Sequence, residues 1–158
     1  MKSELWWPYI ADYDGFPGST VVNLALKTVA PLLGYSTLLV TGVGYQSSTQ
    51  SSGLPDGAEL DVLNSLSAKR LKTIEEHSKA VLVGRFTHRS ERLDYIYVPE
   101  PAGLEAALRS FYRTECPTRQ HYINLKPDPQ WQAFLEFLYP NAETIRFYRA
   151  ELVKLGAL

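Results

Sequence analysis

The order of the elements predicted between Ser36 and Leu125 is the feature that most constrains the fold. Apolar and β-branched runs predict strands, and apolar residues at helical spacing predict helices. Along this segment they follow one another as strand, helix, strand, strand, helix, strand. This is the split βαβ pattern of ferredoxin-like domains, whose right-handed crossovers put both helices on one face of a four-stranded antiparallel sheet. We therefore predict an α+β fold with a ferredoxin-like βαββαβ core over residues 36–126.

Local signals place the helices and strands inside this core. Asp56 can cap a helix over about 58–76, and Pro101 suits the first turn of a second helix over about 101–114. The core-facing residues predicted for the first helix are Leu60, Leu63, Leu71 and Ile74. Strands are predicted at 36–45, 80–87, 93–98 and 120–125. The second and third of these strands are expected to pair as an antiparallel hairpin.

Two flanking segments complete a single predicted domain of 158 residues. Residues 1–35 predict an N-terminal β-hairpin, because aromatic residues run up to a turn at Asp14 and β-branched residues follow it. Residues 127–158 predict C-terminal helices, of which the first begins at Asp128 or Pro129 and the last runs over about 142–155. In the first of them Trp131 lies at helical spacing with other apolar residues, so we expect its side chain to be buried.

Composition excludes several classes of protein. The chain has 16 Lys and Arg against 17 Asp and Glu, so it has no global basic field to hold a nucleic-acid backbone or an anionic membrane. No apolar run reaches the roughly 20 residues that a membrane helix needs, and the N-terminus lacks the pattern of a secretory signal. Cys116 is the single cysteine, so no internal disulfide is required. We therefore expect a cytoplasmic protein with no membrane partner.

Short motifs lie in the predicted hairpin, before the first core helix and in the strand that follows it. They are Asp14-Gly15, Asn23-Leu24-Ala25-Leu26, Gly53-Leu54-Pro55 and Val83-Gly84-Arg85-Phe86-Thr87. These motifs resemble a bacterial domain family of unknown function, number 695, which implies a small cytosolic domain with a ferredoxin-like fold. The pattern of that family also leads us to expect a glycine near position 90, where this chain has Ser90.

The C-terminal part of the chain carries a second resemblance. Its motifs are Asp128-Pro129-Gln130-Trp131, Leu138-Tyr139-Pro140 and Glu151-Leu152-Val153-Lys154-Leu155-Gly156. They resemble the tail of the ribonuclease E regulator B family. For the regulator relatives, this resemblance implies inhibition by binding to a ribonuclease rather than by catalysis. It supplies no catalytic residue for this chain.

The densest basic segment lies in the predicted hairpin of the core and carries the candidate interaction residues. They are Arg85, His88, Arg89 and Arg92, followed by Tyr95 and Tyr97. Three interpretations stay open: a solvated hairpin, a protein-binding edge, and an RNA-binding face of the kind that ferredoxin-like sheets present. The protein-binding hypothesis adds the polar loop at 47–52 to this surface. It makes the chain a noncatalytic binding or regulatory domain with a protein partner.

A hydrolase or small-ligand-binding protein is the alternative. It would join His88 or His121 to Glu75 or Glu76, which lie far apart in the sequence. No metal-ligand spacing, dinucleotide fingerprint or phosphate-binding loop is present, so we expect no cofactor. Cys116 has the acidic Glu115 beside it, which disfavours a thiolate, so we expect this cysteine to be structural.

Overall fold

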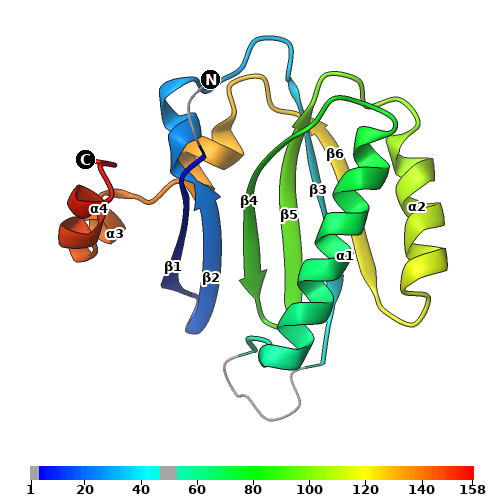
Figure 1. The fold of residues 1–158 in the computed structure, drawn as a ribbon, viewed down its shortest axis with the longest axis horizontal. Coiled ribbons are helices and arrows are strands. Elements are labelled where there is room, and N and C mark those ends of the chain that lie inside the picture. The colour runs from blue at the N-terminus through cyan, green and yellow to red at the C-terminus, as the bar shows by residue number, and fades with distance from the viewer. Residues whose placement is uncertain (1–3, 47–52) are drawn as a thin grey trace.

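The computed structural model describes residues 4–46 and 53–158, and its centre is a six-stranded antiparallel sheet (Figure 1). The strands are β1 (Trp6–Tyr13), β2 (Phe16–Asn23), β3 (Thr37–Gly44), β4 (Val81–His88), β5 (Glu91–Val98) and β6 (His121–Pro127). Their order across the sheet is β1-β2-β4-β5-β3-β6. The predicted α+β class is confirmed, and the sheet is wider than the four strands predicted for the core.

Two long helices lie between the strands of the predicted core. They are α1 (Gly57–Glu75) and α2 (Leu104–Glu115). The predicted cap is present, because the Asp56 Oδ1 atom accepts a hydrogen bond of 2.8 Å from the backbone N–H of Glu59. The shorter elements are the 3₁₀ helix η1 (Leu24–Thr28), the π-helix η2 (Ala133–Leu138), α3 (Ala142–Phe147) and α4 (Arg149–Lys154).

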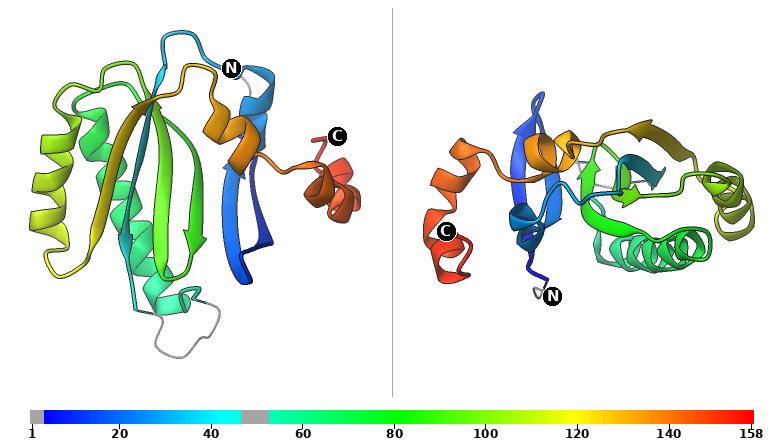
Figure 2. Two further views of the ribbon diagram at one scale, coloured as in Figure 1. Left: turned by 180° about the vertical axis from the view of Figure 1, so that it is seen from behind. Right: turned by 90° about the horizontal axis from the view of Figure 1, so that it is seen from above.

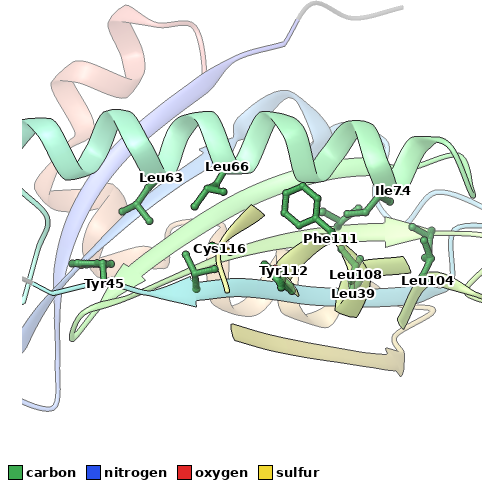
Figure 3. Close-up of a cluster of buried hydrophobic side chains, with 13 residues drawn as sticks. Leu39, Tyr45, Leu63, Leu66, Ile74, Leu104, Leu108, Phe111, Tyr112 and Cys116 are labelled. Atoms are coloured by element: carbon green, nitrogen blue, oxygen red, sulfur yellow. The ribbon is translucent and has the colours of Figure 1, made fainter. Parts of the chain in front are cut away.

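One face of the sheet is covered by α1 and α2, which bury a common hydrophobic core against it (Figure 3). From α1 this core takes Leu63 and Ile74, and from α2 it takes Leu108 and Phe111. The predicted inward face of α1 is wrong at Leu60, which is 42% exposed. The helix is rotated so that Ser67 and Arg70 face inward instead. The reason is a buried ion pair, described below, that hydrophobic periodicity does not detect.

A second core lies on the opposite face of the sheet. It combines the N-terminal hairpin with η2, and α1 and η2 lie on opposite sides of the sheet in the right view of Figure 2. Trp131 is fully buried there, as predicted, and its ring stacks on Tyr97 with centroids 4.2 Å apart. Its indole N–H donates to the backbone carbonyl of Tyr35 at 2.8 Å. Trp131 precedes η2 in a left-handed conformation, so the predicted helix begins later, at Ala133.

Tight two-residue turns close both hairpins. Asp14 and Gly15 connect β1 to β2, and Arg89 and Ser90 connect β4 to β5. All four residues have positive φ angles, which is the requirement of the turn type that matches the twist of the strands. Glycine adopts such angles without strain, which gives a physical reason for expecting one near Ser90.

The C-terminal segment forms two short helices where the sequence predicts one over about 142–155. Tyr148 interrupts the helix with φ −102° and ψ 19°. Its ring packs edge-on against Trp7 of β1, with centroids 5.1 Å apart. Figure 1 shows α3 and α4 beside β1, at the opposite end of the molecule from α2. The segment therefore flanks the first edge of the sheet.

Replacing Trp131 by Ala will lower the free energy of unfolding by about 3–5 kcal/mol, since it removes a fully buried aromatic ring and leaves a cavity. Urea denaturation of the two proteins measures this difference. Phe147→Ala is the matched control, because the Phe147 side chain is 80% exposed and its loss should change stability by less than about 0.5 kcal/mol. Equal stability of wild type and Trp131→Ala would contradict the role of this residue as a core anchor.

Candidate functional site

The structure divides the predicted hairpin residues between the two faces of the sheet. Arg85 pairs with Asp94 across β4 and β5, and both side chains lie on the face that α1 covers. His88 and Tyr95 lie on the opposite face, and Arg89 is exposed in the turn. The four basic residues of the hairpin therefore do not form one basic surface.

Two of the predicted interaction residues are removed from the surface altogether. Tyr97 is fully buried beneath Trp131, and Arg92 is only 5% exposed between the sheet and α1. Burial is the main cause that lowers the pKa of the Arg92 guanidinium to about 10, against the opposite effect of the nearby Asp94 carboxylate. The Nε and Nη1 atoms of Arg92 have no hydrogen-bond partner among the described residues.

A buried ion pair fastens α1 to the sheet. Arg70 Nη2 donates to Asp94 Oδ2 at 2.7 Å, and both side chains are 2% exposed. The other oxygen of the same carboxylate accepts from Arg85 Nε at 3.1 Å. Arg70 also reaches the Tyr112 hydroxyl at 3.4 Å, and that hydroxyl shares a hydrogen bond of 2.5 Å with Thr41. The network joins α1, α2 and three strands.

Asp94→Asn will lower the free energy of unfolding by about 3–5 kcal/mol, because two guanidinium groups lose the charge that compensates them. Urea denaturation at neutral pH measures the change. Glu105→Gln is the matched control, since the exposed ion pair between Glu105 and Arg109 should contribute less than about 1 kcal/mol. A cost for Asp94→Asn no larger than that of the control would show that Asp94 does not hold α1 in place.

Aromatic side chains form a continuous surface row on the face opposite α1 and α2. We call it the aromatic ridge, and it consists of Tyr13, Phe16, Phe86, His88, Tyr95 and Phe137. Neighbouring rings are in contact: Phe86 lies 4.9 Å from Tyr13 and 5.0 Å from Phe137, measured between ring centroids. The Phe137 side chain remains 38% exposed. The ridge comes from both hairpins and η2, so elements far apart in the sequence build it.

A groove of about 670 Å³ adjoins the ridge, and we call it the sheet groove. Its floor is formed by β3, β5 and β6, and η2 forms one wall. Along it lie the carboxylates of Glu91, Asp128 and Glu136 and the ammonium group of Lys126. Glu91 and Glu136 are exposed, and neither takes part in an ion pair within the described parts of the chain. The groove is therefore acidic and partly aromatic.

Asp128 holds the wall of the groove in place. Its carboxylate accepts hydrogen bonds from the Tyr97 hydroxyl at 2.7 Å and from the backbone N–H groups of Gln132 and Ala133 at 2.9 and 3.0 Å. Burial alone would raise the pKa of this carboxyl. The three hydrogen bonds and the positive charge of Lys126 outweigh burial, and the pKa of Asp128 is lowered.

Folding lowers the pKa of Asp128 below its ordinary value of 3.8. The ionised carboxylate therefore stabilises the folded protein in full at pH values above 3.8. This contribution is lost as the pH falls from there through the lowered pKa. The difference in unfolding free energy between wild type and Asp128→Asn will therefore be constant near neutral pH and will shrink below about pH 4. Chemical denaturation at several pH values measures it. A difference that stays constant into the acid range would contradict the assignment.

A polar cleft of about 1250 Å³ lies at the end of the sheet where α1 begins. His88 and His121 both line it, together with Glu59 and Arg119, which form an ion pair with each other. His88 Nε2 lies 3.2 Å from the carbonyl of Tyr13. His121 stacks on Tyr112 at 4.7 Å. In the described structure, neither histidine has a hydrogen bond to a carboxylate.

The carboxylates of the alternative hypothesis lie at the opposite end of α1. Glu75 is the last residue of this 19-residue helix, which rises by roughly 28 Å along its axis. The structure therefore does not bring Glu75 or Glu76 to either histidine of the polar cleft. Among the residues that the structure describes, no group of His, Cys, Asp and Glu side chains is arranged to hold a metal ion. Cys116 is buried, and burial raises the pKa of its thiol, which disfavours the thiolate.

The sequence prediction included His88 and Tyr95 of the ridge but missed its other four residues, and it missed Tyr122 of the sheet groove. The sequence does indicate Phe137, because this large apolar residue lies beside the helix face that holds Phe134 and Leu138 and is therefore expected to be partly exposed. Tyr122 alternates with the inward-facing Ile123 in β6, which places it on the groove side. The polar loop at 47–52 lies outside the described residues.

The fold defines an α+β domain with one sheet face closed by helices and the other partly open. The chain matches a family of unknown function, DUF695, over residues 4–139. It belongs to this family, as the N-terminal motifs predict. No curated protein and no solved structure matches the chain. None of the helices described here combines the length and apolar character needed to cross a bilayer.

Proposed function

We propose that this chain is a noncatalytic protein-binding domain, and that the aromatic ridge together with the sheet groove forms its binding surface. The observation that carries the proposal is the exposure of connected aromatic rings on the face that α1 and α2 leave open. Aromatic side chains dominate the binding energy of protein interfaces because they bury a large area at low entropic cost. Phe137 and Tyr122 are 38% and 41% exposed, so both are accessible to a partner.

The charge of this surface favours a protein over RNA. An RNA-binding sheet combines exposed aromatic residues with basic ones, which neutralise the phosphates. Here the groove carries Glu91 and Glu136, and Lys126 is its single basic group among the lining residues. Arg85 and Arg92, which the sequence placed beside the tyrosines, are turned toward Asp94 and α1. A phosphate backbone would therefore meet repulsion at the groove.

We also infer that β3, α1, β4, β5, α2 and β6 form a ferredoxin-like unit. Three observations support this classification: the six elements follow the split βαβ order, their four strands are adjacent in the sheet, and both helices pack on one face. In this view the N-terminal hairpin extends the sheet beyond β4. A regulatory role toward a ribonuclease or another enzyme, and a cytoplasmic location, remain predictions that rest on the motifs of the tail and the single cysteine.

Affinity capture with the tagged full chain, from a lysate of its source organism, tests the proposal when the captured protein is then purified and titrated. We expect Tyr122→Ser and Phe137→Ser each to weaken binding by about tenfold or more, because central aromatic residues contribute at least about 1–2 kcal/mol to such interfaces. Phe147→Ser is the matched control. It removes an exposed ring from the end of α3, a helix that lies beyond β1 (Figure 1), and should leave the affinity unchanged.

Thermal denaturation of each variant separates loss of binding from loss of folding. This control matters most for Phe137, whose ring also packs against Phe86 and Tyr95. Unchanged affinity in folded Tyr122→Ser and Phe137→Ser would contradict the proposed surface. Capture of RNA in place of protein would contradict the proposed partner class.

A further inference from the structure

The two edges of the sheet differ in whether they can accept another strand. At the first edge, the N–H of Leu24 donates to the carbonyl of Leu5. The register then directs the backbone N–H and C=O groups of the odd-numbered residues of β1 toward β2, and those of the even-numbered residues away from the sheet. Pro8 is one of the outward residues and has no N–H to offer. The carbonyl of Ile10 is another outward group, and it accepts a hydrogen bond of 3.5 Å from Tyr148. This edge is blocked.

The opposite edge, β6, presents backbone N–H and C=O groups that have no backbone partner within residues 4–46 and 53–158. The N–H of Gly44 donates to the carbonyl of Gln120, and the N–H of Asp128 donates to the carbonyl of Ser36. These bonds lie at the two ends of a register without shifts, so the even-numbered residues of β6 pair with β3. The N–H and C=O groups of His121, Ile123 and Leu125 therefore point away from the sheet.

Space is available on both sides of this edge. The sheet groove lies on one side, and Tyr122, Asn124 and Lys126 line it. On the other side a cleft of about 380 Å³ lies between α2 and the beginning of β6, where His121 contributes to its lining. An added strand would direct alternate side chains to these two sides.

The charge of the sheet groove indicates which side chains a strand added at β6 would carry. Glu91 and Glu136 are exposed and have no ion-pair partner within the described residues, whereas Lys126 lies close enough to Asp128 to lower its pKa. Lys or Arg side chains on the groove side of an added strand would meet these two carboxylates and the rings of Tyr95 and Tyr122.

We propose that β6 accepts an extended, positively charged segment of the protein partner as a seventh strand, with its basic side chains in the sheet groove. The inference rests on the proposed function, because it names the segment that this binding surface takes. Main-chain hydrogen bonds to His121, Ile123 and Leu125 provide the affinity of such strand addition, and the groove provides its charge selectivity.

The test uses the full chain and two synthetic peptides of matched length. The first is acetyl-Val-Lys-Val-Lys-Val-Lys-Val-amide, and in the second Glu replaces every Lys. We expect the Lys peptide to bind and the Glu peptide to bind at least about tenfold more weakly. In NMR hydrogen exchange, the Lys peptide should slow exchange of the His121, Ile123 and Leu125 amides, which are open in the free protein. Binding to the groove without strand addition would not protect these amides.

Charge-reversal variants complete the test without disturbing the core. Glu91→Lys together with Glu136→Lys should weaken binding of the Lys peptide by about tenfold, because two attractive contacts become repulsive. Glu143→Lys on α3 is the matched control and should have no effect, since this exposed residue lies outside the groove. Ile123→Pro, if its thermal midpoint stays near that of wild type, should also weaken binding because it removes an outward N–H.

Each contrary result overturns the inference. Absence of Lys peptide binding, equal binding of the Glu peptide, or binding without protection of the three amides would each exclude a basic added strand. So would pairing of β6 with a second copy of the chain, seen as a dimer in sedimentation. In all these cases the effects of Tyr122→Ser and Phe137→Ser on the captured partner still decide the proposed function separately.

Discussion

The arrangement of this domain depends on the ion pairs that the buried carboxylate of Asp94 forms with two arginines. This carboxylate lies on β5 and is shared by Arg70 of α1 and Arg85 of β4, so one buried charge fixes a helix and two strands relative to one another. A buried charge of this kind is costly unless its geometry is satisfied, and it therefore selects one rotation of α1 among those that hydrophobic contact alone would allow. The same rotation exposes Leu60 and places Arg70 in the core.

The pairing of Arg85 with Asp94 also determines which residues the open face can use. Because side chains alternate along a strand, turning Arg85 and Arg92 toward α1 turns Phe86, His88 and Tyr95 to the other side. The open face is consequently aromatic. Acidic side chains predominate along its groove, where Lys126 is the one basic lining residue among those described, and Arg89 of the turn lies over the ring of Phe16 at 4.4 Å. The electrostatic character of the proposed binding surface thus follows from a contact on the opposite side of the sheet.

Local patterns predicted the elements of this fold well because each element carries its own signal. The strands of the core, the Asp56 cap and the burial of Trp131 all follow from periodicity and capping within a few residues. The predicted inward face of α1 is confirmed at Leu63, Leu71 and Ile74. It is wrong at Leu60 and misses Arg70, which pairs with Asp94, 24 residues away. A prediction from the spacing of apolar residues assigns every arginine to the exposed face of a helix, because it takes no account of an ion pair with a distant residue.

The candidate site could be predicted only in part, for a related reason. His88 and Tyr95 were named from the hairpin alone, but the ridge also needs Tyr13 and Phe137 from opposite ends of the chain. Tyr97 lies on the same face of β5 as Tyr95, as alternation along a strand requires, but it is buried because Trp131 stacks on it. Nothing in the hairpin itself indicates where η2 packs.

The blocked edge at β1 has a consequence for how many chains can assemble. A protein with two open sheet edges can join others head to tail without limit, which is the route to fibres. Here Pro8 and Tyr148 close one edge. Copies of this chain therefore cannot join one another edge to edge without limit, because the N-terminal hairpin and its helical flank leave the β1 edge closed to a further strand.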